Sequence, residues 1–468
     1  MPRRRLLSLA LACALSAPAA AQPDAENQEV HRPAVVDPQD LPVKHKSYFV
    51  PFAQIMIGNL TVSVTVQLLG VDWGQASFAT MERNLTTPWE LDDDAFSTNQ
   101  LGHPFNGALS FSVARSTGHN FWVSGLFSFG SSMLWEVLLE NEIPSINDQI
   151  TTPFGGMFIG EAVHRFSRAL LYRPYGKPSF SRRLAAAILD PVGAINRSWW
   201  GDPWAKTVPP SLNAHFGIGF QQPATLLDAN RGGGGQLHVE AYVEHGLTGD
   251  RAFQPRHPLD HFELYTALNI GNDNLEGHLY VRGMLLGSGL WGEQLRGMVG
   301  LFGAYDYNNN DYVRASMLGV GPGGTAELRL GERGYLAGTL AAYMVPYGAA
   351  GGMNEEEGAR LKDHHDGPGL AQVAELKLGE RGVYAIKLTT RAYQIGGRLV
   401  GDAANEFVIR QTAGARINLT RHHAIGIEGT YAWRRADFAD GMGTMAEADR
   451  TLDLRAFYAI TTDEILGR

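Results

Sequence analysis

Several polar residues between positions 103 and 161 carry side chains suited to acid–base or ion-pair chemistry. Five of them stand among apolar or glycine neighbours: His103, Arg115, Glu136, Asp148 and Glu161. A buried charge is costly unless it is paired, so we expect Arg115 to pair with Glu136 or Glu161. A catalytic role would require His103 or a carboxylate that faces a substrate and has a shifted pKa. The candidate polar cluster consists of His103, Arg115, Glu136, Ser145, Asn147, Asp148 and Glu161.

A structural role for part of this cluster is the alternative. The stretch EIPSINDQITTPFGGMFIGE (142–161) contains Ser145, Asn147 and Asp148, whose side chains are able to satisfy backbone donors in a turn between two helices. Ser145 as a nucleophile has no histidine fixed beside it. The histidine and carboxylates of the cluster come from separate segments without the local spacing of a metal site. We therefore expect neither a metal nor a cofactor.

Helical spacing of apolar residues indicates the elements that hold these side chains. Thr152 followed by Pro153 is typical of a helix start, since proline at the first helical position needs no N–H. We expect a helical domain over residues 48–205. Its helices are expected at residues 51–70, 74–85, 105–116, 120–140, 153–172 and 179–197, the last bent or ended near Pro191.

Strips of small side chains predict that two of these helices pack closely. Gly156 and Gly160 form a GxxxG motif, and Ser124, Ser128 and Ser132 recur at every fourth position of the preceding helix. We expect the glycine strip to contact the serine strip directly. The sequence gives no signal for a transmembrane helix, and helices so short and polar are expected to plug or cap a barrel rather than lie in lipid.

After Leu212 the apolar period changes to two, the alternation of a half-buried strand. HFELYTALNI (261–270) and GHLYVRGMLL (277–286) form an expected hairpin, and the turn GERG occurs twice between similar strands. A soluble β-sandwich, in which one face of each sheet is exposed to solvent, is the alternative to a barrel. The predicted fold class is α+β, an N-terminal helical domain followed by a C-terminal antiparallel outer-membrane β-barrel of about twelve strands over residues 211–460.

An outer-membrane barrel turns its polar strand residues inward. Short turns, including NDN, NNN, GERG and TRHH, are expected to face the periplasm, and longer stretches are expected to form external loops. The residues expected to line the lumen include Glu240, Arg282, Lys387, Arg391, Arg410, Arg416, Arg434 and Arg455.

The first residues, MPRRRLLSLALACALSAPAAAQ, have the arginines, short apolar run and small residues of a secretory signal peptide over 1–21. The single cysteine, Cys13, would be removed with it, so the mature chain would form no disulfide. Residues 22–46 are polar and proline-rich and predict a disordered lead-in. The chain has 39 Lys and Arg against 48 Asp and Glu, a balance that argues against a nucleic-acid partner.

Four motifs in the helical part occur in a characteristic order: WELDDDAFSTNQLGHPFNG, then ARSTG, then WEVLLENEIPSINDQITTPFGGMFIGE, then NR near residue 196. This order resembles the bacterial family known as domain of unknown function 3943 over about residues 48–200. The resemblance implies a cell-envelope protein in which a helical unit precedes a β-barrel, and it implies no particular reaction.

These patterns together predict a protein of the outer membrane of a Gram-negative bacterium. We expect a non-catalytic envelope role such as lipid or small-solute handling by a periplasmic or lumenal helical domain. The alternatives are a lipid-acting enzyme that uses the polar cluster and a passive pore. The expected partners are outer-membrane lipid, a small-molecule or lipid ligand, and the barrel-assembly machinery during biogenesis.

Overall fold

The computed structural model describes most of the chain beyond the first residues. The predicted signal peptide (1–21), with Cys13, and the predicted lead-in (22–46) lie outside the described residues. The described residues are 47–92, 94–173, 176–201, 210–224, 234–250, 253–271, 275–310, 312–352, 364–397, 403–440 and 443–462.

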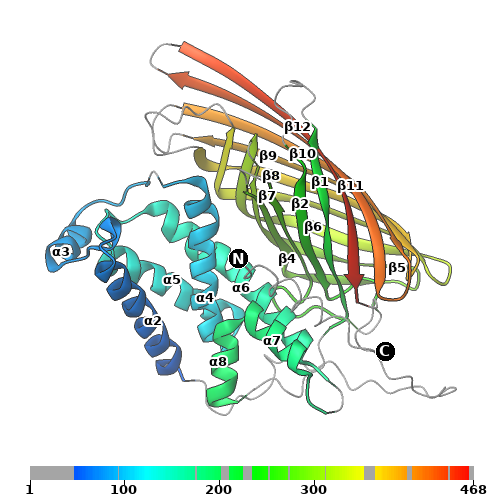
Figure 1. Cartoon of the computed structure of the whole chain (residues 1–468), viewed down its shortest axis with the longest axis horizontal. Helices are drawn as coiled ribbons and strands as arrows, with labels where there is room; N and C mark the ends of the chain where they lie inside the picture. Colours follow the sequence, from blue (N-terminus) through cyan, green and yellow to red (C-terminus); the bar gives the residue numbers. More distant parts are fainter. Residues whose placement is uncertain are drawn as a thin grey trace.

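Helices occupy the N-terminal part of the described chain (Figure 1). Polar side chains cap several of them: Ser77, Asn120, Ser145, Ser179 and Asp190 each accept a backbone N–H of the first turn. The helices are α2 (Phe49–Leu68), η2 (Asp72–Gly74), α3 (Phe78–Thr86), η3 (Thr98–Gly102), α4 (His103–Ser116), α5 (Phe121–Leu134), η4 (Trp135–Leu139), α6 (Ile146–Leu171), α7 (Phe180–Leu189) and α8 (Pro191–Trp200).

The long helix α6 begins earlier than its sequence predicts. Ser145 is its N-cap and accepts the N–H of Asp148, while Pro153 lies inside the helix. The predicted start at Thr152 and Pro153 is therefore wrong. The serine cap already satisfies the first free donors, and the neighbouring helices hold the proline in place, so that the helix continues through it.

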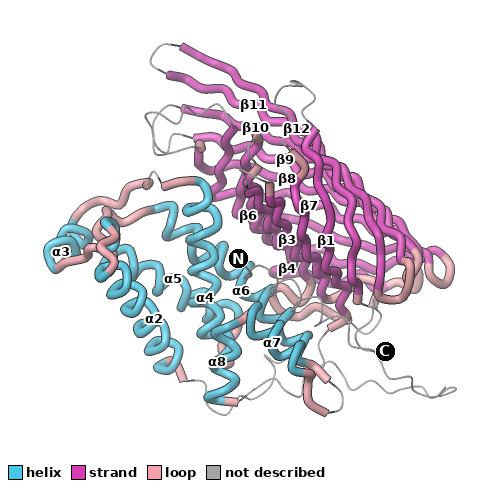
Figure 2. The backbone as a smooth tube through the Cα atoms, in the orientation of Figure 1, coloured by secondary structure: helices cyan, strands magenta, loops and turns pink. Residues whose placement is uncertain are grey.

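Strands form a closed antiparallel barrel after the helices (Figure 2). Each strand pairs with its sequence neighbours, and β1 closes the barrel against β12. The strands are β1 (Leu212–Ala224), β2 (Gln236–His245), β3 (Phe262–Ile270), β4 (Leu275–Trp291), β5 (Leu295–Asn309), β6 (Val313–Leu330), β7 (Gly334–Gly352), β8 (His365–Glu380), β9 (Tyr384–Gly397), β10 (Ala403–Asn418), β11 (His423–Asp440) and β12 (Gly443–Thr461). The predicted architecture, helices followed by an outer-membrane-type barrel of twelve strands, is confirmed.

The expected hairpin is the antiparallel pair β3 and β4. Both GERG turns lie at the barrel end where β1 begins and β12 ends, since they join β6 to β7 and β8 to β9. β3, β5 and β7 finish at the opposite end, so NNN at the end of β5 does not share the rim of the GERG turns, while NDN (272–274) lies outside the described residues. The expectation that all short turns share one rim is wrong, because strand direction alternates in an up-and-down barrel whatever the length of each connection.

The lumen is lined by polar residues, as the alternation of the strands predicts. Lys377 on β8 donates to the Tyr242 hydroxyl on β2 at 2.9 Å and lies 3.2 Å from Glu244. Of the other residues expected to face inward, Arg282 pairs with Glu263 and Arg434 pairs with Glu406. A cavity of about 160 Å³ remains, lined among others by Glu240, Lys387, Arg391, Arg410, Arg416 and Arg455.

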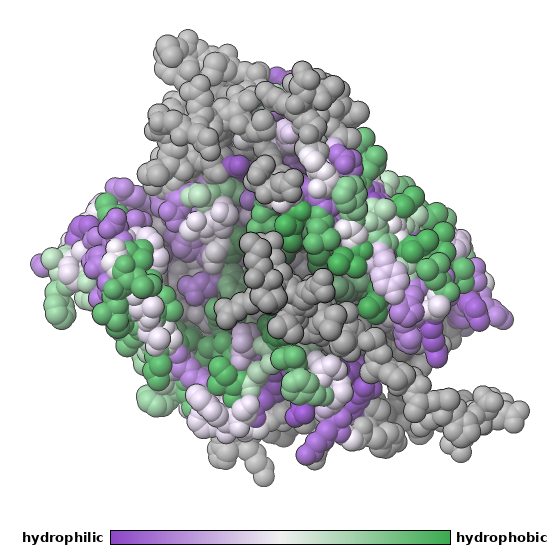
Figure 3. Space-filling model, in the orientation of Figure 1, coloured by the Kyte–Doolittle hydropathy of each residue, from purple (hydrophilic) through white to green (hydrophobic). Residues whose placement is uncertain are grey.

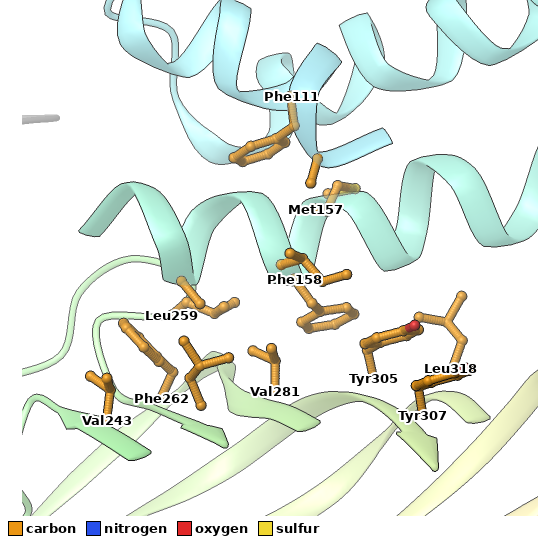
Figure 4. Packing of buried hydrophobic residues seen from close by; sticks show 14 of the residues in the cluster. Phe111, Met157, Phe158, Val243, Leu259, Phe262, Val281, Tyr305, Tyr307 and Leu318 are labelled. Carbon is orange, nitrogen blue, oxygen red and sulfur yellow. The ribbon is translucent and has the colours of Figure 1, made fainter. Parts of the chain in front are cut away.

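The helical bundle packs against the outer wall of the barrel (Figures 1 and 2). In Figure 4, α6 lies between Phe111 of α4 and the strands, and its Phe158 points towards Val281 and Tyr305. The strand residues in this contact have the outward orientation, because residues such as Glu263 and His278 on the alternating positions line the lumen. The expectation that the helices plug or cap the barrel is therefore wrong: apolar side chains fix them to its flank.

The bundle contains three closely packed helices, with α4 in contact with both α5 and α6. A side chain added at Gly156 of α6 would come 2.4 Å from the backbone of Gly107 in α4. On α5, the Ser128 hydroxyl donates to the carbonyl of Gly107 at 2.9 Å. The glycine strip of α6 therefore faces α4, which also contacts Ser128 of the serine strip. The expected contact between the helices α5 and α6 does exist, but it places Met157 of α6 against Gly125 of α5.

Candidate functional site

Acidic groups and one histidine gather where the first turns of α4 and α6 meet. Nε2 of His103 lies 3.4 Å from a carboxylate oxygen of Asp148 and 3.9 Å from one of Asp94. We call this group the seam cluster, because it lies where the helices meet the barrel wall. Its members are Asp92, Asp94, His103, Glu136, Glu140 and Asp148.

The segment that carries half of the seam cluster is fixed to the outer wall of the barrel. The Phe96 ring stacks on Tyr307 of β5 at 5.4 Å and meets the edge of His364 at the same distance. The Tyr305 hydroxyl of β5 donates to the carbonyl of Gln100. The cluster is therefore built from both parts of the fold, with the barrel as a support for its helical residues.

Hydrogen bonds of Ser145 and Asn147 hold the segments of the cluster together. The Ser145 hydroxyl donates to the Asn147 side-chain oxygen at 2.8 Å, and that oxygen also accepts the N–H of Asp92 at 3.1 Å. The N–H of Ser145 donates to a carboxylate oxygen of Glu136 at 2.8 Å. These contacts agree with the alternative in which Ser145, Asn147 and Asp148 have a structural role in a turn. They also hold the acidic groups close together.

Burial and mutual repulsion keep protons on several of these carboxyl groups. Burial raises the pKa of Glu136 to about 7, with a smaller contribution from Asp92. Burial and then the neighbouring Glu136 raise the pKa of Glu140 to about 8. Burial and Asp92 also raise the pKa of Asp148 well above its ordinary range. The site thus combines three carboxyl groups whose pKa values lie above their ordinary range.

Two members of the seam cluster have the opposite preference. Burial would raise the pKa of Asp92, but hydrogen bonds from Asp148 and Asn99 lower it below the ordinary value. Burial would lower the pKa of His103, but Asp94 and Glu136 raise it. Nε2 of His103 has no hydrogen-bond partner among the described residues. An imidazolium in contact with buried carboxyl groups is able to transfer a proton or to bind an anionic group.

Arg115 and Glu161 lie in a separate ion-pair group. Nε and Nη2 of Arg115 donate to the two carboxylate oxygens of Glu161 at 2.6 and 3.1 Å. Arg165 also pairs with Glu161, and it contacts Asp260 in the segment between β2 and β3 at 2.8 Å. Burial opposes ionisation of Glu161, but the two arginines outweigh it and lower the pKa to about 2. This group joins α4 and α6 to the barrel and leaves no open position for chemistry among its described contacts.

Several members of these groups were not predicted from the sequence. Asp92 and Asp94 belong to the DDD run of the quoted WELDDDAF motif, a signal that could have identified them. His164 pairs with Asp190 at 3.4 Å, and the Ser112 hydroxyl donates to the same carboxylate at 2.5 Å. Asp190 is also the N-cap of α8. Because Ser112 bonds to the carboxylate and not to the imidazole, this trio lacks the order of a nucleophilic triad.

The described part of the chain contains no cluster of side chains that could bind a metal ion. No group of three or more histidine, aspartate, glutamate or cysteine side chains is placed to hold a metal ion there.

Residues 88–192 match the model of a family described as a domain of unknown function (DUF3943). The resemblance indicated by the sequence motifs is confirmed over this range, which includes all six residues of the seam cluster. No curated protein matches the chain.

Several solved barrels are similar to this chain. The CymD monoaromatic hydrocarbon channel has 9% identity and a TM-score of 0.24, over 55% of this chain and 89% of that one. The NanC porin has 10% identity and a TM-score of 0.25, over 53% of this chain and 99% of that one. The toluene transporter TodX of Pseudomonas putida has 8% identity and a TM-score of 0.22, over 55% and 90%.

Proposed function

We propose that this chain is an outer-membrane protein that handles a lipid or a small amphipathic solute at the seam cluster. The observation that carries the proposal is the position of the cluster. Carboxyl groups with raised pKa values and His103 lie where the helices meet the outer wall of the barrel, beside apolar side chains. A molecule with an anionic head group and apolar chains matches both features, since the head group meets His103 and the chains meet the apolar surfaces.

A passive pore finds less support than lipid handling. Arg391 and Arg410 on one side of the lumen reach His278 on β4 at 3.3 and 3.4 Å, and Arg416 reaches His215 on β1 at 2.7 Å. Such contacts cross the barrel beside a lumenal cavity of about 160 Å³. Because side-chain contacts cross the lumen, the helical bundle on the outer wall is the better candidate for the functional surface.

A lipid-acting enzyme is the second candidate, and one observation favours it. A general acid–base catalyst works best with a pKa near the working pH, and burial raises the pKa of Glu136 to about 7. His103 next to Asp148 provides a second proton-transfer group. In this alternative the seam cluster would change the bound lipid chemically rather than hold it.

The test introduces each substitution into the chromosomal gene and measures the lipids of the cell envelope by mass spectrometry. His103→Ala, Glu136→Gln and Asp148→Asn are each expected to change the lipid inventory and to increase sensitivity to detergent. Asp72→Asn is the matched control, because Asp72 is an exposed acidic residue of the same domain. Heat-modifiable migration in detergent gels verifies that each variant reaches the outer membrane folded.

Incubation of the purified protein with envelope lipids separates the two candidates. Lipid that co-purifies without chemical change, and is lost in the His103→Ala variant, supports handling. A new lipid product that requires Glu136 supports the enzyme. Folded variants with an unchanged envelope and unchanged lipid binding would contradict both.

A further inference from the structure

Helix α2 has its polar and apolar residues reversed relative to a helix of a water-soluble protein. It turns Pro51, Ile55, Asn59 and Ser63 inward, and the Asn59 carboxamide donates to the Ser131 hydroxyl of α5 at 3.0 Å. Its outward face is apolar, whereas a surface helix in water has a polar outward face. The exposed large side chains of α2 are Phe49, Phe52, Ile57, Leu60, Val62, Val64 and Leu68.

Helix α5 repeats this reversal beside α2. It buries Ser124, Ser128, Ser131 and Ser132, and the Ser110 hydroxyl of α4 donates to Ser131 at 2.9 Å. Its exposed large side chains are Trp122, Leu126 and Phe129. Side-chain hydrogen bonds between helices and close packing through small residues are the means by which helices associate in lipid.

The length of α2 fits a bilayer. It has 20 residues and no charged side chain, which at about 1.5 Å per residue matches the hydrocarbon thickness of about 30 Å. Phe49–Leu68 and Phe121–Leu139 are both long and apolar enough to cross a membrane, contrary to the absence of such a signal in the sequence analysis. Only 22% of the α2 window is buried, so α2 is not a core helix of the bundle.

Exposed apolar side chains cover both these helices and the free wall of the barrel. Leu388 and Ile427 are exposed on strands away from the bundle, at 49% and 65% of their surface. Hydrophobic side chains gather over α2 and over the free barrel wall in Figure 3. Because α6 holds the bundle against the outer wall, a bilayer that surrounds the barrel must also meet the bundle.

We infer that the helical bundle is embedded in the outer membrane beside the barrel, with α2 and α5 in contact with lipid acyl chains. The inference rests on the outer-membrane location in the proposed function. It adds an unusual arrangement, in which transmembrane-length helices and a β-barrel of one chain share the same lipid. The seam cluster then lies at the junction between two lipid-facing surfaces, where a membrane lipid reaches it directly.

The test places single cysteines in the mature chain, which lacks Cys13 once the predicted signal peptide is removed. Leu60→Cys and Val64→Cys report on α2, Leu388→Cys reports on the barrel wall, and Glu293→Cys in the exposed turn after β4 is the aqueous control. Each protein is labelled with a small fluorophore and placed in vesicles of brominated phosphatidylcholine. We expect loss of fluorescence at positions 60 and 64 to the same extent as at 388, and no loss at 293.

Quenching at 388 without quenching at 60 and 64, together with rapid reaction of both α2 cysteines with a membrane-impermeant maleimide, would overturn the inference and leave the barrel location standing. A disulfide between Leu60→Cys residues of two copies, with α2 shielded from lipid, would also overturn it. Absence of quenching at 388 would reject the membrane location, and the inference with it. All four substitutions replace exposed side chains, so folding is expected to be retained.

Discussion

At Glu136 the fold stabilises the protonated carboxyl, and this preference makes stability depend on pH. The folded pKa is about 7 and the ordinary value is 4.5. Between these values the unfolded chain releases the proton and the folded chain keeps it, so stability decreases as the pH rises. Glu136→Gln removes this titration, and we expect it to stabilise the protein by about 1–3 kcal/mol above pH 7 and to have little effect at acidic pH.

Thermal unfolding in detergent at a series of pH values measures this effect. Glu82→Gln on the exposed face of α3 is the matched control and is expected to keep the wild-type profile. A Glu136→Gln variant whose profile follows the wild type at every pH would show that the buried carboxyl ionises normally.

Glu161 has the opposite role, because it neutralises two buried arginines. Glu161→Gln leaves Arg115 and Arg165 without their shared anion, and removal of one partner of a buried pair costs about 3–5 kcal/mol. We expect a large decrease in folded protein and in the midpoint of denaturant unfolding. Asp437→Asn is the control, since Asp437 and Arg435 form an exposed pair that contributes about 0–1 kcal/mol. Equal losses in the two variants would contradict the structural role of the buried group.

At the scale of elements, the contact of α6 with α4 depends on glycine. A side chain at Gly156 would meet the α4 backbone, whereas one at Gly130 of α5 would meet no atom within 4 Å. We expect Gly156→Leu to destabilise the protein by about 1–3 kcal/mol or more, and Gly130→Leu to be close to neutral. Folded yield and thermal midpoint measure both, and a fully stable Gly156→Leu variant would contradict the close helix contact.

The sequence predicted the elements better than their contacts. Period-two alternation identified the strands and the inward orientation of Glu240 and Arg455, because lumen and lipid differ in polarity. It could not distinguish strand residues that face lipid from those that face α6, since Val281 under the helix and Leu376 in the free wall are equally apolar. The expected plug or cap failed for this reason.

The candidate site was predicted in part for a similar reason. The sequence identified His103, Glu136 and Asp148, which the fold brings to one place. It grouped them with Arg115 and Glu161, because burial among apolar neighbours marks a paired ion and a site residue alike. Long-range contacts, such as the one between Arg165 and Asp260, decide which of these charges is fully paired. The local spacing of residues does not encode such contacts.

At the scale of the whole molecule, the barrel has two different faces. Its lumen is crossed by ion pairs and hydrogen bonds, while its outer wall binds a helical bundle that carries the seam cluster. The barrel in this account is a rigid support in the membrane, and the functional surface lies on its flank.

A structure of the protein in lipid nanodiscs tests this account most directly. We predict that α6 lies against the outer face of β1–β7, that lipid surrounds both the bundle and the free barrel wall, and that head-group density lies near His103 and Asp148. Helices inside the lumen or below the barrel, together with an open lumen and no density at the seam cluster, would contradict it.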